Sequence, residues 1–266
     1  MLLSLLRTAL ISDPLIVLST SVMGTLSTLA ALFDGTGRAP HNIARAWART
    51  LLAVSGIQLR VEGLDCIDSQ ASYVFASNHL SLIDTPVVLA AIPAEFRFLA
   101  KLSLRKVPFI GWHLNRAGHI FVPLGDTRAS AKVMRLAAGV IRRQGISIHV
   151  FPEGGRSHGE LQEFKEGAAY LAIKAGVPLV PMAITGTLGI LPTGSINVKA
   201  GQVLLRIGDP IPTTGLKRRD RTELTARLRE EISRLLAETR DSTLNSRFPR
   251  GQAVSQRPVQ PAENGN

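Results

Sequence analysis

Short runs of β-favouring residues alternate with longer helical runs along most of this chain, and this alternation constrains the fold more than any other feature. Helical runs occupy residues 85–92, 127–143, 167–176 and 220–238. Strand-like runs occupy residues 58–63, 73–77, 97–100, 119–123, 146–151, 178–184 and 203–208. Strands that alternate with helices predict an α/β fold, with a mainly parallel sheet flanked by helices on both faces. We expect this domain to span residues 51–240.

The first part of the chain differs from the rest. Residues 14–33 carry no charge and lie between Asp13 and Asp34. A helix of this length reaches about 30 Å, the thickness of the hydrocarbon core of a bilayer. Ser, Thr and Gly dilute the stretch, so a full span, a helix that dips into one leaflet and a buried core helix all stay open.

Basic residues and a tryptophan follow this stretch, as is typical where a chain leaves a bilayer on the cytoplasmic side. They are Arg38, Arg45, Trp47 and Arg49. We therefore expect residues 1–50 to form a membrane-associated helical segment at the cytoplasmic face. Residues 241–266 are rich in Ser, Gln, Pro, Arg and Asn with few apolar residues, which predicts a disordered tail.

The chain carries 31 Lys and Arg against 20 Asp and Glu, a formal net charge of +11. This excess favours an anionic partner: nucleic acid, an anionic membrane surface, or a phosphorylated substrate. Aromatic residues make up 5% of the chain, too few for a base-stacking platform, so we expect no nucleic acid. The single cysteine, Cys66, allows no internal disulfide and predicts no metal cluster.

His79 and Asp84 follow the strand-like run at 73–77 and are the first pair with catalytic chemistry. Five residues apart, they do not share a face of one helix. They meet if His79 lies in a turn and Asp84 in the first turn of the next helix, where the carboxylate fixes the imidazole tautomer and leaves the other nitrogen as a base. The alternatives are a triad with Ser81 as nucleophile, and a helix N-cap beside a histidine without a catalytic role.

A second segment, FPEGGRS at residues 151–157, follows another strand. Its glycines allow a ligand close to the backbone, and Arg156 offers a fork for a phosphate or carboxylate. Glu153 is expected to pair with Arg156 or to hold a substrate hydroxyl, and Lys165 adds a second cation downstream. An ordinary tight turn with a solvated arginine is the alternative.

Together these segments resemble the glycerolipid acyltransferase family that includes 1-acylglycerol-3-phosphate acyltransferase. The family pattern N-H-x-x-x-x-D matches Asn78–Asp84, and F-P-E-G-x-R-S matches Phe151–Ser157. Further family elements match at Lys101 with Pro108–Trp112, at Phe164–Gly167 and at Val177–Pro181. The matches keep the family order from about residue 57 to 210.

The resemblance implies that His79 takes the proton from a lysolipid hydroxyl while Asp84 orients the ring. It implies substrate-binding roles for Asn78, Lys101, Glu153, Gly154, Arg156, Ser157 and Lys165. It also implies acyl-CoA or acyl-carrier protein as the acyl donor, a membrane lipid as the acceptor, an anionic membrane as the surface, and neither a metal nor a further cofactor. The predicted activity is acyl transfer to lysophosphatidic acid, giving phosphatidic acid in phospholipid biosynthesis.

Two departures from the family pattern bear on the acceptor. Pro123 and Leu124 stand where relatives often carry an arginine for the acceptor phosphate, and Gly155 stands where threonine is commoner. Arg128 or Lys101 are expected to replace that cation. Another lysolipid such as a lyso-ornithine lipid, glycerol-3-phosphate as acceptor, an inactive membrane scaffold, and a basic membrane-surface protein without catalysis stay open as alternatives.

Overall fold

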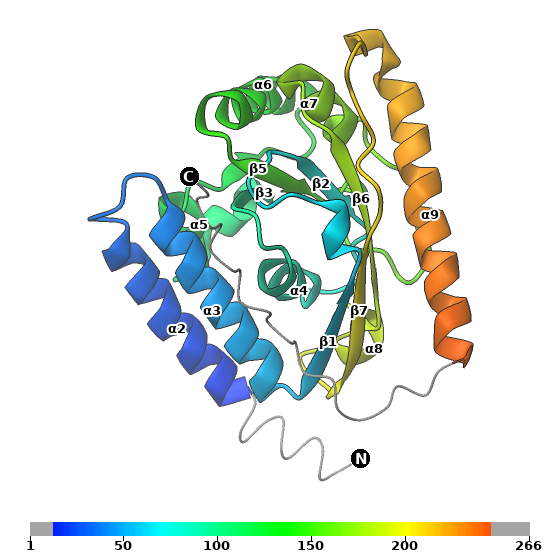
Figure 1. The fold of residues 1–266 in the computed structure, drawn as a ribbon. Helices are drawn as coiled ribbons and strands as arrows, with labels where there is room; N and C mark the ends of the chain where they lie inside the picture. The colour runs from blue at the N-terminus through cyan, green and yellow to red at the C-terminus, as the bar shows by residue number, and fades with distance from the viewer. Residues whose placement is uncertain (1–12, 246–266) are drawn as a thin grey trace, which may run out of the picture.

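The computed structural model describes residues 13–245, which fold around one seven-stranded sheet in the order β1-β7-β6-β2-β5-β3-β4 (Figure 1). The strands are β1 (Ile57–Glu62), β2 (Val74–Ser77), β3 (Phe96–Lys101), β4 (Ile120–Val122), β5 (Ser147–Val150), β6 (Leu179–Thr185) and β7 (Gly201–Ile207). Each neighbouring pair is parallel except β6 with β7, which is antiparallel. The predicted mainly parallel α/β sheet is therefore confirmed.

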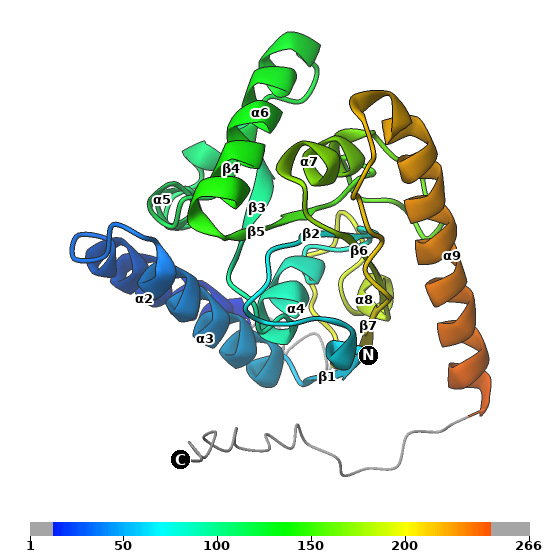
Figure 2. The ribbon, with the colours of Figure 1, turned by 45° about the horizontal axis from the view of Figure 1, so that its top comes forward.

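Helices cover both faces of the sheet, as the alternating pattern predicted (Figure 2). The α-helices are α2 (Asp13–Ala30), α3 (Arg38–Val54), α4 (Asp84–Ala91), α5 (Ile110–Arg116), α6 (Thr127–Gln144), α7 (Gly167–Ala175), α8 (Thr187–Ile190) and α9 (Arg221–Asn245). Short 3-10 turns stand at Leu64–Cys66, Leu102–Lys106 and Arg218–Asp220.

The strands of the sheet separate two hydrophobic cores. On β2, Phe75 points into the core that α3 and α4 cover, while Val74 and Ala76 point into the core that α6, α7 and α9 cover. Successive side chains of a strand point to opposite faces of the sheet, which explains this alternation. Because the side chains on both faces of β2 are apolar, the strand is buried on both sides.

The N-terminal helices α2 and α3 pack side by side as a hairpin against the domain (Figure 1). The expected boundary at residue 50 falls inside α3, which contributes Ala44, Ala48 and Leu51 to the core. Trp47 is half-buried, and its Nε1 donates to Thr20 Oγ1 of α2 at 3.2 Å. The indole therefore links the two helices, and its expected place at a membrane interface stays a prediction.

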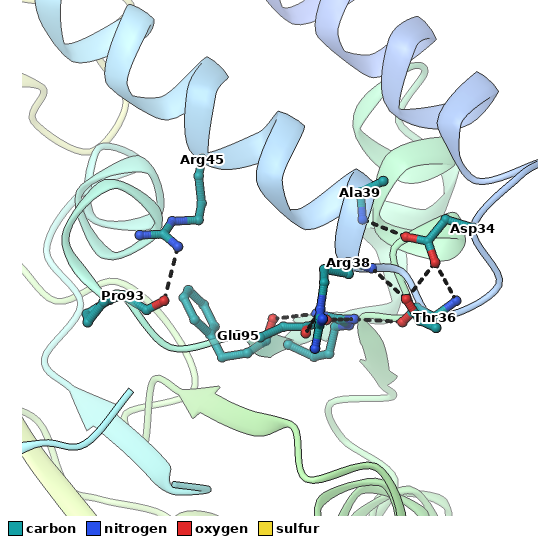
Figure 3. Close-up of polar contacts among 9 residues, drawn as sticks. Asp34, Thr36, Arg38, Ala39, Arg45, Pro93 and Glu95 are labelled. Atoms are coloured by element: carbon teal, nitrogen blue, oxygen red, sulfur yellow. Dashed lines mark hydrogen bonds and ion pairs between the residues drawn. The ribbon is translucent and has the colours of Figure 1, made fainter. Parts of the chain in front are cut away.

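Polar contacts order the turn into α3 and join this helix to the region around β3 (Figure 3). Asp34 accepts hydrogen bonds from the backbone of Thr36 and Ala39 and so orders the turn into α3. Arg97 of β3 is 2% exposed, donates to the Thr36 carbonyl at 3.0 Å and pairs with Glu95 at 2.7 Å. A buried arginine that loses such partners leaves an uncompensated charge, so these contacts hold α3 in place.

Within residues 13–245, no helix combines the length and apolar character needed to cross a bilayer. Helix α9 continues to Asn245, past the expected end of the domain at residue 240. The rest of the predicted tail, residues 246–266, lies outside the described residues, as do residues 1–12.

Candidate active site

The predicted functional segments meet at one edge of the sheet. Strands β2, β3 and β5 are mutually parallel in the central part of the sheet and end at Ser77, Lys101 and Val150. Residues 78–84 and 151–157 directly follow two of these ends. The carboxyl edge of a parallel sheet is where ligand sites form in open α/β folds, so topology alone brings the two segments together.

His79 and Asp84 are in direct contact. Asp84 is the first residue of α4, and its Oδ2 lies 2.8 Å from His79 Nδ1. The same oxygen accepts the backbone N–H groups of Leu80 at 2.6 Å and Ser81 at 2.8 Å. Asp84 is fully buried, whereas the side chain of His79 is 16% exposed.

This geometry assigns the imidazole nitrogens to different tasks. Asp84 accepts three hydrogen bonds on one oxygen, so Nδ1 of neutral His79 carries the proton and Nε2 has a free lone pair. A buried carboxylate also stabilises the imidazolium that forms when Nε2 takes a proton. The pair therefore has the geometry that a general base requires.

The segment 151–157 holds the main chain of His79 from both sides. Glu153 Oε1 accepts the His79 backbone N–H at 2.7 Å, and the Ser157 backbone N–H donates to the His79 carbonyl at 2.8 Å. The other Glu153 oxygen accepts the Gln162 backbone N–H at 3.0 Å. Glu153 and Ser157 are thus buried and bonded to the His79 main chain, which gives them a part in positioning the histidine; their expected contact with a substrate stays a prediction.

Asn78 connects the end of β2 to the neighbouring strand β6. Its side chain is buried, its Nδ2 donates to the Ile184 carbonyl at 2.9 Å, and its Oδ1 accepts the Ile184 N–H at 2.8 Å. Both ends of the amide thus tie the end of β2 to β6. Asn78 therefore fixes the strand end from which His79 projects, and its expected role in substrate binding stays a prediction.

Ser81 is excluded as a nucleophile by its surroundings. It is fully buried, and its Oγ donates to the Leu191 carbonyl at 2.8 Å and accepts from the Ile83 N–H. It orders the turn that leads into α4. Among residues 13–245, no cluster of three or more His, Cys, Asp and Glu side chains has the arrangement of a metal site.

Three of the predicted cations are exposed at this edge: Lys101, Arg156 and Lys165. Lys165 lies across Gly154, where an added Cβ would stand 2.5 Å from the Lys165 Nζ. Gly154 has a φ of 73°, a conformation that favours glycine. The glycine therefore lets the lysine chain cross the turn close to the backbone.

Phe151 is a positioning residue that the sequence reasoning left without a role. Its ring stacks on the His79 imidazole with centroids 3.9 Å apart and planes 15° from parallel. Behind it lies His149, fully buried on β5, with its ring edge-on to Phe151 at 4.6 Å. In the sequence, Phe151 comes directly after a strand that ends at the predicted site. This position was the available indication that its ring lies near the candidate base.

Burial keeps His149 neutral. It lowers the pKa of His149 to about 3, with a further contribution from the charge of His79. Its Nε2 lies 3.2 Å from Ser77 Oγ, at the end of β2. The neutral ring supports the aromatic stack without adding charge beside the base.

The chain is similar to known acyltransferases. The family model described as Acyltransferase matches residues 58–185. A chloroplastic 1-acyl-sn-glycerol-3-phosphate acyltransferase of Arabidopsis thaliana is 34% identical over 184 residues, covering 68% of this chain and 51% of that protein. An uncharacterized acyltransferase of Schizosaccharomyces pombe is 30% identical over 203 residues, covering 74% of this chain and 72% of its own length.

The matched region spans about half the length of the plant relative. Among solved structures, the crystal structure of the 1-acyl-sn-glycerophosphate acyltransferase PlsC from Thermotoga maritima superposes with a TM-score of 0.77 at 25% identity. That superposition covers 92% of this chain and 98% of the PlsC chain. With a relative matched over most of its length and the same architecture, this chain belongs to the acyltransferase family that includes the 1-acyl-sn-glycerol-3-phosphate acyltransferases.

Proposed function

We propose that this protein transfers a fatty acyl group from a thioester carrier to the free hydroxyl of 1-acyl-sn-glycerol-3-phosphate, giving phosphatidic acid. The observation that carries the proposal is the 2.8 Å contact between His79 Nδ1 and buried Asp84, which leaves Nε2 as the base. The names of the plant relative, a 1-acyl-sn-glycerol-3-phosphate acyltransferase, and of the Thermotoga maritima structure, a 1-acyl-sn-glycerophosphate acyltransferase, support this acceptor.

The reaction is a direct transfer. His79 Nε2 takes the proton of the acceptor hydroxyl while the hydroxyl oxygen bonds to the thioester carbonyl carbon. The carbon–sulfur bond then breaks, and the leaving sulfur takes the proton back from the imidazolium. Such a base contributes on the order of 10²–10⁴-fold in rate, and alignment of the two substrates contributes the rest. No side chain is acylated, in keeping with the buried position of Ser81.

The acceptor phosphate is assigned to the exposed cations at the catalytic edge. Arg156 lies on the same turn as Glu153 and Ser157, which bond to the His79 main chain. A phosphate bound by Arg156 would therefore be held at a fixed position relative to the base. A guanidinium binds a phosphate through two parallel hydrogen bonds, which adds orientation to charge. Lys165 and Lys101 flank it as additional cations.

We further propose that the enzyme works at an anionic membrane surface through helix α2. Six apolar side chains of α2 are exposed, and Leu32 and Phe33 after it are 61% and 91% exposed. A row of exposed apolar side chains on a folded domain marks an interaction surface. A helix that lies in the plane of the membrane interface buries such an apolar face among the lipids. The six are Leu15, Val17, Leu18, Val22, Leu26 and Leu29.

The test is a substrate panel with membranes from cells that express the protein. Labelled acyl-CoA and acyl-carrier protein are each offered with 1-acyl-sn-glycerol-3-phosphate, glycerol-3-phosphate, a lyso-ornithine lipid and other lysophospholipids, and the products are read by mass spectrometry. Phosphatidic acid above the level of membranes without the protein is the expected result. Acylation of another acceptor alone would refute the proposed acceptor, and the absence of any acylated product would refute the activity.

A further inference from the structure

The positive charge of the chain is concentrated in one segment. Residues 96–146 contain ten Lys and Arg and one acidic residue, Asp126, whereas the rest of the chain contains twenty-one Lys and Arg against nineteen Asp and Glu. Nearly all of the net charge of +11 therefore comes from this segment. Charge that is clustered in this way produces a strong positive potential over one part of the surface, which attracts an anionic partner to that part.

Half of these cations lie on helix α6. All five are exposed, and none forms an ion pair with a carboxylate among residues 14–239. Their spacing places them within about 100° of the helix circumference, along about 22 Å of its length. We call this surface the basic face of α6. It consists of Arg128, Lys132, Arg135, Arg142 and Arg143.

The charged side chains of helix α9, which also faces solvent, are arranged differently from those of α6. Its Arg234 is paired with both Glu231 and Glu238, so cations and carboxylates alternate along its surface. Helix α6 has no Asp or Glu between Thr127 and Gln144. Like charges one turn apart destabilise a helix slightly, which makes an unpaired row of this length a feature for an external partner.

The position of the basic face relates it to the acyl donor. Helix α6 begins five residues after β4, whose end lies beside Lys101 at the carboxyl edge. That edge carries His79, three strands away in the sheet, or about 14 Å at the usual strand spacing. The N-terminal end of the face, with Arg128, is therefore the part nearest the edge where the thioester is attacked, and the face extends from there toward the start of β5.

The shape and surroundings of the basic face argue against a bilayer or a coenzyme as its partner. The apolar side of α6, with Ala137, Ala138 and Ile141, is buried in the core and is not free to enter a bilayer. Figures 1 and 2 also show α6 apart from α2, which carries the exposed apolar row. The phosphates of a coenzyme are too compact to contact a row about 22 Å long.

We propose that the basic face of α6 is the docking surface for an acidic protein that carries the acyl group, namely acyl-carrier protein. This inference rests on the proposed function, because it names the macromolecular donor of that same reaction. A helix with a row of carboxylates complements the row of cations, and Leu136, 58% exposed at its flank, adds an apolar contact. Such complementary charge accelerates association and selects the partner.

The experiment compares two double charge reversals in the full-length protein. Lys132→Glu/Arg135→Glu changes the basic face, and Arg218→Glu/Arg227→Glu makes the same charge change at exposed positions at and near α9. KM and kcat are measured with acyl-carrier protein and acyl-CoA bearing the same chain. Binding of fluorescently labelled acyl-carrier protein is followed by anisotropy, and co-sedimentation with phosphatidylglycerol-containing vesicles is measured in parallel.

For the α6 variant we expect the KM for acyl-carrier protein and its Kd to rise by about tenfold or more, as for charge reversal at a steered interface. The KM for acyl-CoA, vesicle binding and both kcat values should stay within about threefold of wild type, and the control variant should match wild type. An equal rise with both donors, a loss confined to vesicle binding, or no effect would each overturn the proposal.

The outcomes separate this inference from the proposed function. A wild-type protein that makes phosphatidic acid from acyl-CoA but neither binds nor uses acyl-carrier protein would refute the docking surface alone. Wild-type binding of acyl-carrier protein that is lost in the α6 variant, without acyl transfer from either donor, would refute the proposed activity and keep the docking surface.

Discussion

Replacing Asp84 with Asn removes the charge beside the base while keeping its shape. One oxygen, Oδ2, accepts from His79 Nδ1, Leu80 N and Ser81 N, and the other has no hydrogen-bond partner. An Asn whose amide oxygen takes the Oδ2 position therefore keeps all three bonds. The substitution tests the electrostatic part of the site with little change in its geometry.

The magnitude follows from the loss of one charge opposite the imidazolium. Two unit charges about 4 Å apart at an effective dielectric constant of about 20 attract by about 4 kcal/mol. Since the imidazolium forms as the reaction proceeds, this energy is lost mainly from the transition state and corresponds to about 10³-fold in kcat. The KM values for both substrates should change by less than about threefold, because Asp84 is fully buried behind His79.

The assay measures initial rates of phosphatidic acid formation for wild type, Asp84→Asn, His79→Gln and the double variant. Residues that act as one unit are not additive, so the double variant should be no slower than His79→Gln alone. Thermal unfolding within a few degrees of wild type serves as the control for folding. Asp84→Asn with a kcat within threefold of wild type, or full additivity in the double variant, would refute the reasoning.

Four further predictions concern other parts of the molecule. Arg156→Ala should raise the acceptor KM about tenfold and leave the donor KM near wild type; an equal rise in both would make the arginine structural. Phe151→Leu should lower kcat about tenfold with unchanged KM values, because the stacked ring that orients His79 is lost; a changed KM alone would contradict this. Phe33→Ser should weaken co-sedimentation with anionic vesicles about tenfold or more, since inserting one phenylalanine contributes about 1.5–3 kcal/mol; Val54→Ser, at a 38% exposed site on α3, is the control, and equal losses would disfavour α2 as the docking face. Burial lowers the pKa of His41 to about 3, so the unfolded chain binds one more proton than the folded chain between about pH 6.5 and 3, and the free energy of unfolding decreases as the pH is lowered through this range. His41→Phe should therefore reduce the loss of unfolding free energy between pH 7 and pH 5 by about 2 kcal/mol in urea titrations, and an unchanged loss would be inconsistent with a neutral His41.

Much of the fold could be predicted because its information is local. The run at residues 73–77 is apolar at successive positions, which marks a strand buried on both faces, and residues 127–143 have a clear helical period. The contact of His79 with Asp84 was predictable for the same reason, since five residues fit only a turn followed by a first helical turn. The antiparallel pairing of β6 with β7 has no such local signature.

The roles of several site residues depended on contacts distant in the sequence. Asn78 bonds to Ile184, and Glu153 bonds to His79, over separations of 106 and 74 residues. In each case the polar residue type indicated a hydrogen-bonding role. Only the folded structure shows that the partner is a backbone group of a distant segment. The packing of Trp47 on Thr20 was missed for the same reason.

The most direct test of the central claim is the single-turnover rate of His79→Ala with acyl-CoA and 1-acyl-sn-glycerol-3-phosphate, measured beside the dissociation constant for the acceptor. The general-base account predicts a fall of about 10²–10⁴-fold in the rate, with acceptor binding within about threefold of wild type. A His79→Ala protein that forms phosphatidic acid at the wild-type rate would contradict it.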